Sequence, residues 1–210
     1  MTISIQYLPI ESLINYNGHV LINMDMYQIK WTRLQSEIFR LLCIKSGKSL
    51  NLRDIARSLE KSPTAVSNVL QELKKEGLIK ITKSENINLL SIELNRDNQN
   101  TINMKRVENL KMIYESGLLE LLQDTFPGTT IILFGSYSRG DDIYGPNKEN
   151  RSDIDIAIIG TKGKEINLAE FIKKLERVIF INFYPSFKEI HKHLRDNILN
   201  GILLSGSIDI

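Results

Sequence analysis

The chain has 210 residues, of which 42% are hydrophobic and 25% are charged, and its formal net charge is +2. This composition is that of an average soluble globular protein and excludes a wholly disordered chain. No apolar run reaches the roughly 18 residues that span a bilayer, and the N-terminus lacks a secretory signal pattern, so we expect a cytoplasmic protein with no membrane partner. The single cysteine, Cys43, excludes an internal disulfide and is expected to be a buried structural thiol.

Residues 1–30 are an N-terminal extension, rich in Ile, Tyr and Asn, whose pattern leaves a hairpin and an irregular cap equally open. Residues 31–95 carry clearer signals. Apolar residues recur at helical spacing from Trp31 until Gly47, and a short helix is predicted over residues 51–59.

A third helix and two strands complete this first region. Ser62 at the N-cap and Pro63 at the first helical position start the helix, which ends at Gly77. Residues 78–82 and 87–94 are predicted to be the strands of a hairpin. Helix, short helix, capped helix and hairpin, in this order, predict a winged helix-turn-helix domain.

Positive charge is concentrated in the same region. Between Trp31 and Lys83 there are eleven Lys and Arg against five Asp and Glu, whereas between Phe126 and Ile190 there are nine of each. A local basic surplus is typical of a surface that binds nucleic acid, and a merely solvated face gives the same count.

Residues 96–210 predict a second domain, in which helices flank a mixed sheet, so the fold class is α/β (α+β). The predicted elements are a polar linker over 95–103, helices over 104–125, 167–177 and 188–200, and strands over 129–134, 154–159, 178–183 and 201–206. The first of these helices is expected to pack through an apolar stripe that includes Val107, Leu110 and Tyr114. Gly117 is expected to divide it.

Two carboxylates begin the strand over 154–159. Residues two apart on a strand point to the same side, so Asp153 and Asp155 share one face while the intervening isoleucine faces the core. Adjacent carboxylates repel each other unless a cation lies between them. Mg²⁺ meets this demand, since it favours one or two carboxylates together with substrate phosphates. The sequence therefore predicts a metal site at Asp153 and Asp155.

A phosphate-binding motif ends the preceding strand. Gly135 lets a phosphate approach the backbone, and the Ser136 hydroxyl can donate to a phosphate oxygen. Arg139, three residues on, can offset the charge of a triphosphate.

Together these motifs resemble the nucleotidyltransferase superfamily that includes DNA polymerase beta, especially its minimal, antitoxin-like branch. The resemblance rests on Phe134-Gly135-Ser136, the Gly-Ser-x-x-Arg-Gly form and Ser152-Asp153-Ile154-Asp155-Ile156. It implies transfer of a nucleoside monophosphate from an NTP to an acceptor, with Mg²⁺ or Mn²⁺ on Asp153 and Asp155. Gly135, Ser136 and Arg139 would bind the triphosphate, and a toxin-like protein is a candidate partner and acceptor.

The sequence departs from that family in two ways. The spacer from Tyr137 to Ser152 has sixteen residues, longer than is usual, and its middle is predicted to be an inserted loop. Active members also bring a third carboxylate from a following strand, where this chain is expected to have Asn182. An amide cannot act as a base, and Asp141, Asp142 or Glu189 are the candidate substitutes. Competent catalysis, a degenerate NTP-binding site and purely structural carboxylates all stay open.

The first domain resembles the winged helices of the multiple-antibiotic-resistance and arsenic-responsive repressor families. The resemblance is carried by Ser62-Pro63-Thr64-Ala65-Val66-Ser67 and by Leu73-Lys74-Lys75-Glu76-Gly77-Leu78-Ile79. It implies a helix in the major groove of DNA, with bases and phosphates contacted by Ser62, Thr64, Ser67, Asn68, Gln71, Lys80 and Lys83. The alternative is a winged helix that serves protein contacts; two-fold operators would require a homodimer.

Two functions therefore compete. The first is a magnesium-dependent nucleotidyltransferase that a DNA-binding winged helix localises. The second is a transcriptional regulator whose degenerate transferase domain senses a nucleotide.

Overall fold

The computed structural model describes residues 31–83, 90–145 and 152–208. The expectation for residues 1–30 lies outside the described residues, as do the tip of the predicted hairpin and the middle of the inserted loop. Residues Arg33–Ile210 form one compact unit. None of the helices in the described residues has the length and apolar character needed to span a bilayer.

The first region is the predicted winged helix. Its elements are α1 (Arg33–Ile44), α2 (Leu52–Ser58), α3 (Pro63–Lys75), β1 (Ile79–Lys83) and β2 (Leu90–Leu94). The two strands pair antiparallel, with Ile79 opposite Leu94. At the start of α3, the Ser62 side chain accepts a hydrogen bond from the Ala65 N–H at 3.2 Å, so the predicted N-cap is confirmed. Cys43 is fully buried in this core, as expected for a structural thiol.

A long helix follows sooner than the sequence suggested. α4 spans Gln99–Ser116, so the predicted linker over 95–103 is too long. The Asn98 side chain accepts a hydrogen bond from the Asn100 N–H, and this N-cap starts the helix within a stretch too polar to show helical periodicity. Gly117, with a φ of 81°, separates α4 from α5 (Leu118–Thr125) as predicted.

The predicted apolar stripe of this helix is wrong in part. Val107 is 67% exposed and Tyr114 is 47% exposed, whereas Lys105 and Asn109 are buried. The physical reason is a buried carboxylate, Asp142, toward which α4 turns these two polar side chains. Tertiary pairing therefore overrides the hydrophobic pattern on this helix.

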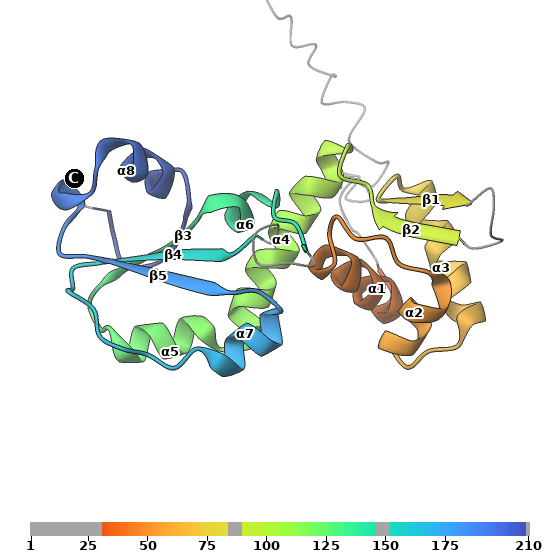
Figure 1. The fold of residues 1–210 in the computed structure, drawn as a ribbon, viewed down its shortest axis with the longest axis horizontal. Helices are drawn as coiled ribbons and strands as arrows, with labels where there is room; N and C mark the ends of the chain where they lie inside the picture. Colours follow the sequence, from red (N-terminus) through yellow and green to blue (C-terminus); the bar gives the residue numbers. More distant parts are fainter. Residues whose placement is uncertain (1–30, 84–89, 146–151, 209–210) are drawn as a thin grey trace, which may run out of the picture. The chain divides into compact units, whose positions relative to one another are not determined.

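The second region is a four-stranded mixed sheet with helices on both faces (Figure 1). The remaining elements are β3 (Thr130–Phe134), α6 (Gly135–Arg139), β4 (Ile154–Ile159), α7 (Ala169–Leu175), β5 (Ile179–Tyr184), the 3-10 helix η4 (Phe187–Glu189), α8 (Lys192–Leu199) and β6 (Ile202–Ser205). The strand order is β5-β4-β3-β6. β3 is antiparallel to β4 and β6, and β4 is parallel to β5.

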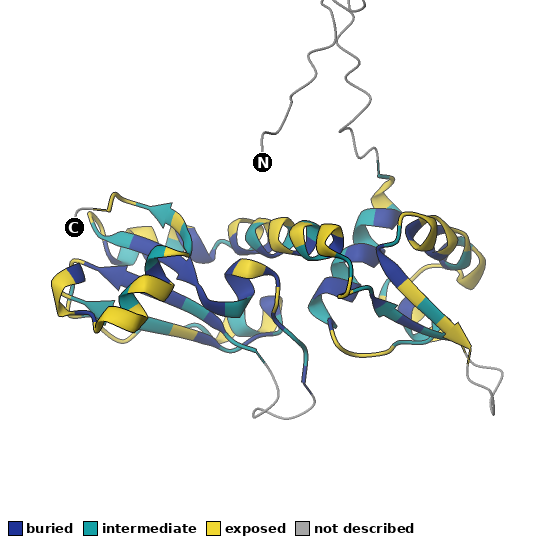
Figure 2. Cartoon of the chain, turned by 90° about the horizontal axis from the view of Figure 1, so that it is seen from above, coloured by how far each residue is buried: buried dark blue, intermediate teal, exposed yellow. Residues whose placement is uncertain are grey.

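Two apolar clusters cover the two faces of this sheet. Ile154, Ile156 and Ile158 pack on one face with residues of α4, α5 and α7. Ala157 and Ile159 point to the other face, where Ile198 of α8 packs. Buried residues run along the strands in Figure 2. The central strands β3 and β4 are thus buried on both sides except near their ends, whereas the edge strands β5 and β6 are mostly half-buried or exposed. The domain boundary near residue 95, between β2 and α4, stays a prediction.

Candidate functional site

The antiparallel pairing of β3 and β4 brings the two predicted motifs together. Phe134, the last residue of β3, lies opposite Asp155, so Gly135 is adjacent to the carboxylate of Asp155. Gly135 has a φ of 77°, and a Cβ at this position would lie 2.5 Å from Asp155 Oδ2. Only glycine therefore permits this approach of backbone and carboxylate.

A short helix that the sequence did not predict carries the phosphate-binding motif. α6 begins at Gly135 itself, and the Ser138 hydroxyl donates to the Gly135 carbonyl at 2.8 Å. The backbone N–H of Asp141 donates to the Ser136 carbonyl at 3.0 Å. Five residues are too few to show helical periodicity, and Gly140, with a φ of 80°, is the one signal that marks its end. Ser136 is half-buried next to the end of β3.

The two predicted metal ligands interact electrostatically. Burial, and secondly the negative charge of Asp153, raise the pKa of Asp155 above its usual value. Both side chains are half-buried at the start of β4. A divalent cation on these oxygens would offset both effects, so the donor set and its charge fit Mg²⁺ or Mn²⁺.

Arg139 is half-exposed and engaged within its own loop. Its Nε donates to Asp141 Oδ2 at 3.0 Å, and both side chains are just over half exposed. An ion pair this exposed contributes little stability, so Arg139 can turn to another anion at low cost. The structure places Arg139 one helical turn from Ser136, but leaves it paired with Asp141.

The register of β5 on β4 determines which residue of β5 lies beside Asp155. In the parallel pairing of β4 with β5, the residue level with Asp155 is Phe180, and Asn182 is level with Ala157. Asp141 is paired with Arg139, and Glu189 lies in η4, beyond the opposite end of β5. In the part of the chain that the structure describes, no group of three or more His, Cys, Asp or Glu is placed to hold a metal ion.

Asp142 is also unsuited to that role, because it is the centre of a buried cluster. Its carboxylate forms an ion pair with Lys105, accepts from Asn109 Nδ2 at 2.7 Å and accepts from Arg177 Nη2 at 3.1 Å. Arg177 Nη2 also donates to the Ile44 carbonyl at the end of α1, at 2.8 Å. We call Lys105, Asn109, Asp142 and Arg177 the Asp142 cluster. No local pattern predicts this cluster, because its members come from α4, from the segment after α6 and from the segment before β5, which are far apart in the sequence.

The predicted DNA-contacting residues lie on the surface of the winged helix. Thr64, Asn68 and Gln71 are exposed along α3, and Ser67 is half-buried. The remaining residues are Ser62, which caps α3, Lys80, which forms an ion pair with Asp97, and the exposed Lys83. The exposed polar side chains of α3 lie on the solvent-facing side of the helix, opposite its buried residues, as a recognition helix requires.

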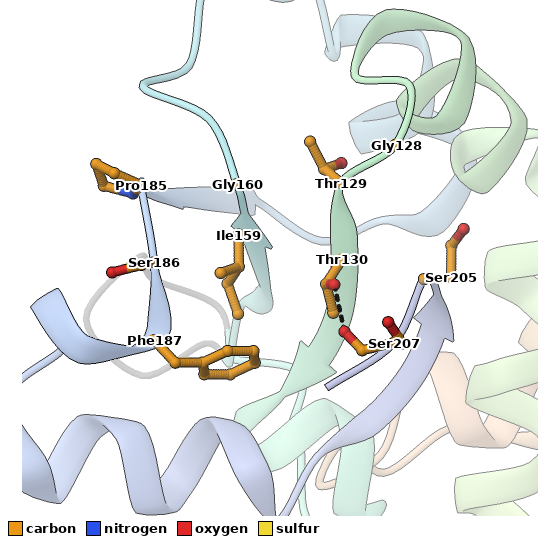
Figure 3. Close-up of a pocket in the computed structure, with 11 residues that line it drawn as sticks. Gly128, Thr129, Thr130, Ile159, Gly160, Pro185, Ser186, Phe187, Ser205 and Ser207 are labelled. Atoms are coloured by element: carbon orange, nitrogen blue, oxygen red, sulfur yellow. Dashed lines mark hydrogen bonds between the residues drawn. The ribbon is translucent and has the colours of Figure 1, made fainter. Parts of the chain in front are cut away.

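A cavity of 460 Å³ lies at the opposite end of the sheet from Asp155 (Figure 3). It is lined by the start of β3 with Thr130, the end of β4 with Ile159, the segment after β5 with Phe187, and the end of β6 with the residues that follow it. The Thr130 hydroxyl donates to the Ser207 carbonyl at 2.5 Å. None of the predicted site residues lines this cavity.

Comparison with known proteins supports two domains of different kinds. Residues 35–86 match the model of the MarR family, and residues 115–204 match that of the nucleotidyltransferase domain. Among solved structures, the chain is similar to a mutant of ZitR from Lactococcus lactis, at 20% identity over 56% of this chain and 77% of that chain, with a TM-score of 0.37. No curated protein matches the chain.

Two further solved structures are similar at the same level. The adhesin competence repressor AdcR from Streptococcus pyogenes is 20% identical over 50% of this chain and 74% of that chain, with a TM-score of 0.38. MepR, a transcription regulator of the Staphylococcus aureus multidrug efflux pump MepA, is 21% identical over 48% of this chain and 70% of that chain, with a TM-score of 0.37. From the two family models and the order of its elements, the chain carries a winged-helix domain of the MarR family followed by a nucleotidyltransferase domain.

Proposed function

We propose that this protein is a DNA-binding regulator that senses a nucleoside triphosphate, bound with Mg²⁺ at Asp153 and Asp155. The observation that carries the proposal is the register of β5 on β4. Beside the paired carboxylates β5 offers Phe180 and Asn182, neither of which can accept a proton as a base. β5 thus supplies no base for an acceptor beside the residues that would bind a metal-bound triphosphate.

Each part of the site has a distinct task in binding. Asp153 and Asp155 hold the metal ion, which neutralises charge on the phosphates when it is bound. Gly135 keeps the backbone clear of the Asp155 carboxylate, and the Ser136 hydroxyl donates to a phosphate oxygen. Arg139 exchanges Asp141 for the triphosphate, which carries more negative charge.

Hydrogen bonds lead from this site to the winged helix. Asn109 Nδ2 donates to the Tyr137 carbonyl in α6 at 2.9 Å, and also to Asp142. Asp142 accepts from Arg177, which donates to Ile44 at the end of α1. At the other end of α1, Gln35 Nε2 donates to Glu72 of α3 at 2.9 Å. These contacts give a physical basis for coupling nucleotide binding in α6 to the helix that would enter the DNA.

On the DNA side, Thr64, Ser67, Asn68 and Gln71 read base edges, while Ser62, Lys80 and Lys83 contact phosphates. The basic surplus of residues 31–83 provides the sequence-independent attraction. A homodimer would place two copies of α3 on a two-fold operator.

The test begins with a duplex selected from a random DNA pool by the full chain. The dissociation constant of this duplex is then measured by fluorescence anisotropy, with and without each NTP and Mg²⁺, for the wild type and Asp155→Asn. We expect one NTP to change the wild-type dissociation constant roughly 5- to 150-fold, the usual range of allosteric coupling, and to leave the variant unchanged. An equal DNA affinity with and without every NTP would contradict sensing.

The second candidate is transfer of a nucleoside monophosphate to an acceptor, possibly a toxin-like protein. The retained pair Asp153 and Asp155 beside Gly135 favours it. An acceptor hydroxyl would attack the α-phosphorus, the α–β phosphoanhydride bond would break, and pyrophosphate would leave. The check is transfer of label from an α-³²P-labelled NTP to macromolecules of a cell extract. Labelling by the wild type and not by Asp155→Asn would favour this candidate over sensing.

A further inference from the structure

We propose that Phe180 and Asn182 of β5 bind the base of the nucleotide, with the Phe180 ring stacked on the base and the Asn182 amide hydrogen-bonded to its edge. This inference rests on the proposed function, because it requires the triphosphate to be held at Asp153 and Asp155. It adds the part of the site that distinguishes one NTP from another.

Phe180 and Asn182 lie on the strand next to Asp155. β5 is an edge strand of the larger sheet, parallel to β4, and Phe180 is level with Asp155. Paired residues in adjacent strands project to the same face, about 5 Å apart. The opposite face is identified by Ile154, Ile156, Ile179 and Ile181, which pack with α4, α5 and α7. Phe180 and Asn182 therefore lie on the face of Asp155, one strand further out.

The ring of Phe180 is exposed to solvent. The chain has seven phenylalanines, all within the described residues, and Phe180 is the one that is exposed, at 52%. It belongs to neither of the apolar clusters that cover the sheet. An uncovered ring costs free energy in water and regains it when a flat partner covers it. Its place beside the metal site indicates that this partner is part of the nucleotide.

The ring of Phe180 and the amide of Asn182 are chemically suited to bind a nucleobase. Every nucleobase has an aromatic face, so a phenylalanine ring binds the four bases with similar affinity. Asn182 follows two residues later on the same face and is half-buried. Within the described residues its side chain has no hydrogen-bonding partner. An amide offers one acceptor and two donor hydrogens, which can match the edge of one base better than the others.

The two residues therefore have separable effects. Phe180→Ala should weaken binding of all four NTPs by about 10-fold, because stacking contributes to each of them. Phe180→Trp should keep the wild-type affinity, because it keeps an aromatic face. Asn182→Ala should reduce the difference in affinity between the preferred NTP and the other three.

The experiment is calorimetric titration of the full chain with ATP, GTP, CTP, UTP and inorganic tripolyphosphate, each with Mg²⁺. Tripolyphosphate has no base, so Phe180→Ala should bind it as the wild type does. The matched control is Leu203→Ala, which removes an exposed apolar side chain (43%) from β6, the other edge strand of the same sheet. This variant should bind NTPs and tripolyphosphate like the wild type.

Three results would overturn the inference. Unchanged NTP binding by Phe180→Ala would show that no base stacks on the ring, and an equal loss of tripolyphosphate would show that the ring supports the phosphate site instead. An unchanged order of NTP affinities in Asn182→Ala would remove the amide from base recognition. If the wild type binds neither NTPs nor tripolyphosphate, the proposed function fails first, and that outcome is distinguishable from the other three.

Discussion

Two carboxylates, those of Asp142 and Asp155, lie thirteen residues apart in sequence and in opposite environments. Asp142 is fully buried and has two cationic partners, Lys105 and Arg177, besides the amide of Asn109. Asp155 is half-buried, and the charge next to it, that of Asp153, has the same sign. A buried and fully paired acid is a structural element, whereas two half-buried carboxylates that repel each other at the start of a strand are suited to hold a cation. We therefore expect Asp142 to contribute to stability and Asp155 to contribute to the proposed binding site.

The largest expected effect is that of Asp142→Asn. This change leaves the buried Lys105 and Arg177 without a counter-charge, and should lower the free energy of unfolding by about 3–5 kcal/mol. Urea denaturation at neutral pH measures it. The matched control is Asp141→Asn, which alters the exposed neighbour and should change stability by less than about 0.5 kcal/mol. Equal effects of the two variants would show that Asp142 has no special structural role.

An intermediate effect is expected for Gly135→Ala. The new Cβ would lie 2.5 Å from Asp155 Oδ2, and the alanine would have to keep a positive φ. The substitution should therefore lower the free energy of unfolding by about 1–2 kcal/mol. Because it displaces the Asp155 carboxylate, it should also weaken NTP binding. Gly128→Ala, which introduces a Cβ at a positive φ with no atom within 4 Å, is the control for backbone strain alone. If both variants bind the NTP as the wild type does, the contact of Gly135 with Asp155 is irrelevant to the site.

The smallest effect has the opposite sign. With EDTA present, Asp155→Asn should raise the free energy of unfolding at pH 7 by a few tenths of a kcal/mol, allowing for screening of a half-exposed group. The pKa of Asp155 is higher in the folded state than in the unfolded state, so the carboxyl is more easily protonated when the protein is folded. The destabilisation by Asp155 is therefore absent at pH values below the usual pKa of aspartate. It develops as the pH rises toward the raised pKa.

Unfolding curves of the wild type and Asp155→Asn, recorded from acid to neutral pH, check this sign. The stability difference should vanish at the acid end and favour the variant at neutral pH. A variant less stable than the wild type at neutral pH would place Asp155 in the same class as Asp142.

Local signals in the sequence were sufficient for much of this fold. The Ser62-Pro63 start of α3 and the break at Gly117 depend on a few adjacent residues, and both are confirmed. The end of one strand at Gly135 and the start of the next after Asp153 were also predicted from adjacent residues, and both agree with the structure. Where a local signal decides the structure, the sequence can be interpreted without knowledge of the remaining chain.

The rest depends on contacts between distant segments. Lys105 and Asn109 interrupt an apolar pattern, and only Asp142 explains why they are buried. The pairing of Phe180 with Asp155 depends on the register of two parallel strands joined by a helix, and no local signal specifies that register. For that reason Asn182 could be named from the sequence as the residue at the place of the third carboxylate, while the position of Phe180 beside Asp155 could not.

The most direct test of the central claim is calorimetric titration of the wild type and Asp155→Asn with the four NTPs, each with Mg²⁺ and again with EDTA. Asp124→Asn, which changes an exposed carboxylate of α5, is the control. We expect binding of at least one NTP to the wild type and to Asp124→Asn that requires Mg²⁺ and is lost in Asp155→Asn. Binding that persists in EDTA or in Asp155→Asn, or no binding to the wild type, would contradict the assignment of Asp153 and Asp155 as a metal–nucleotide site.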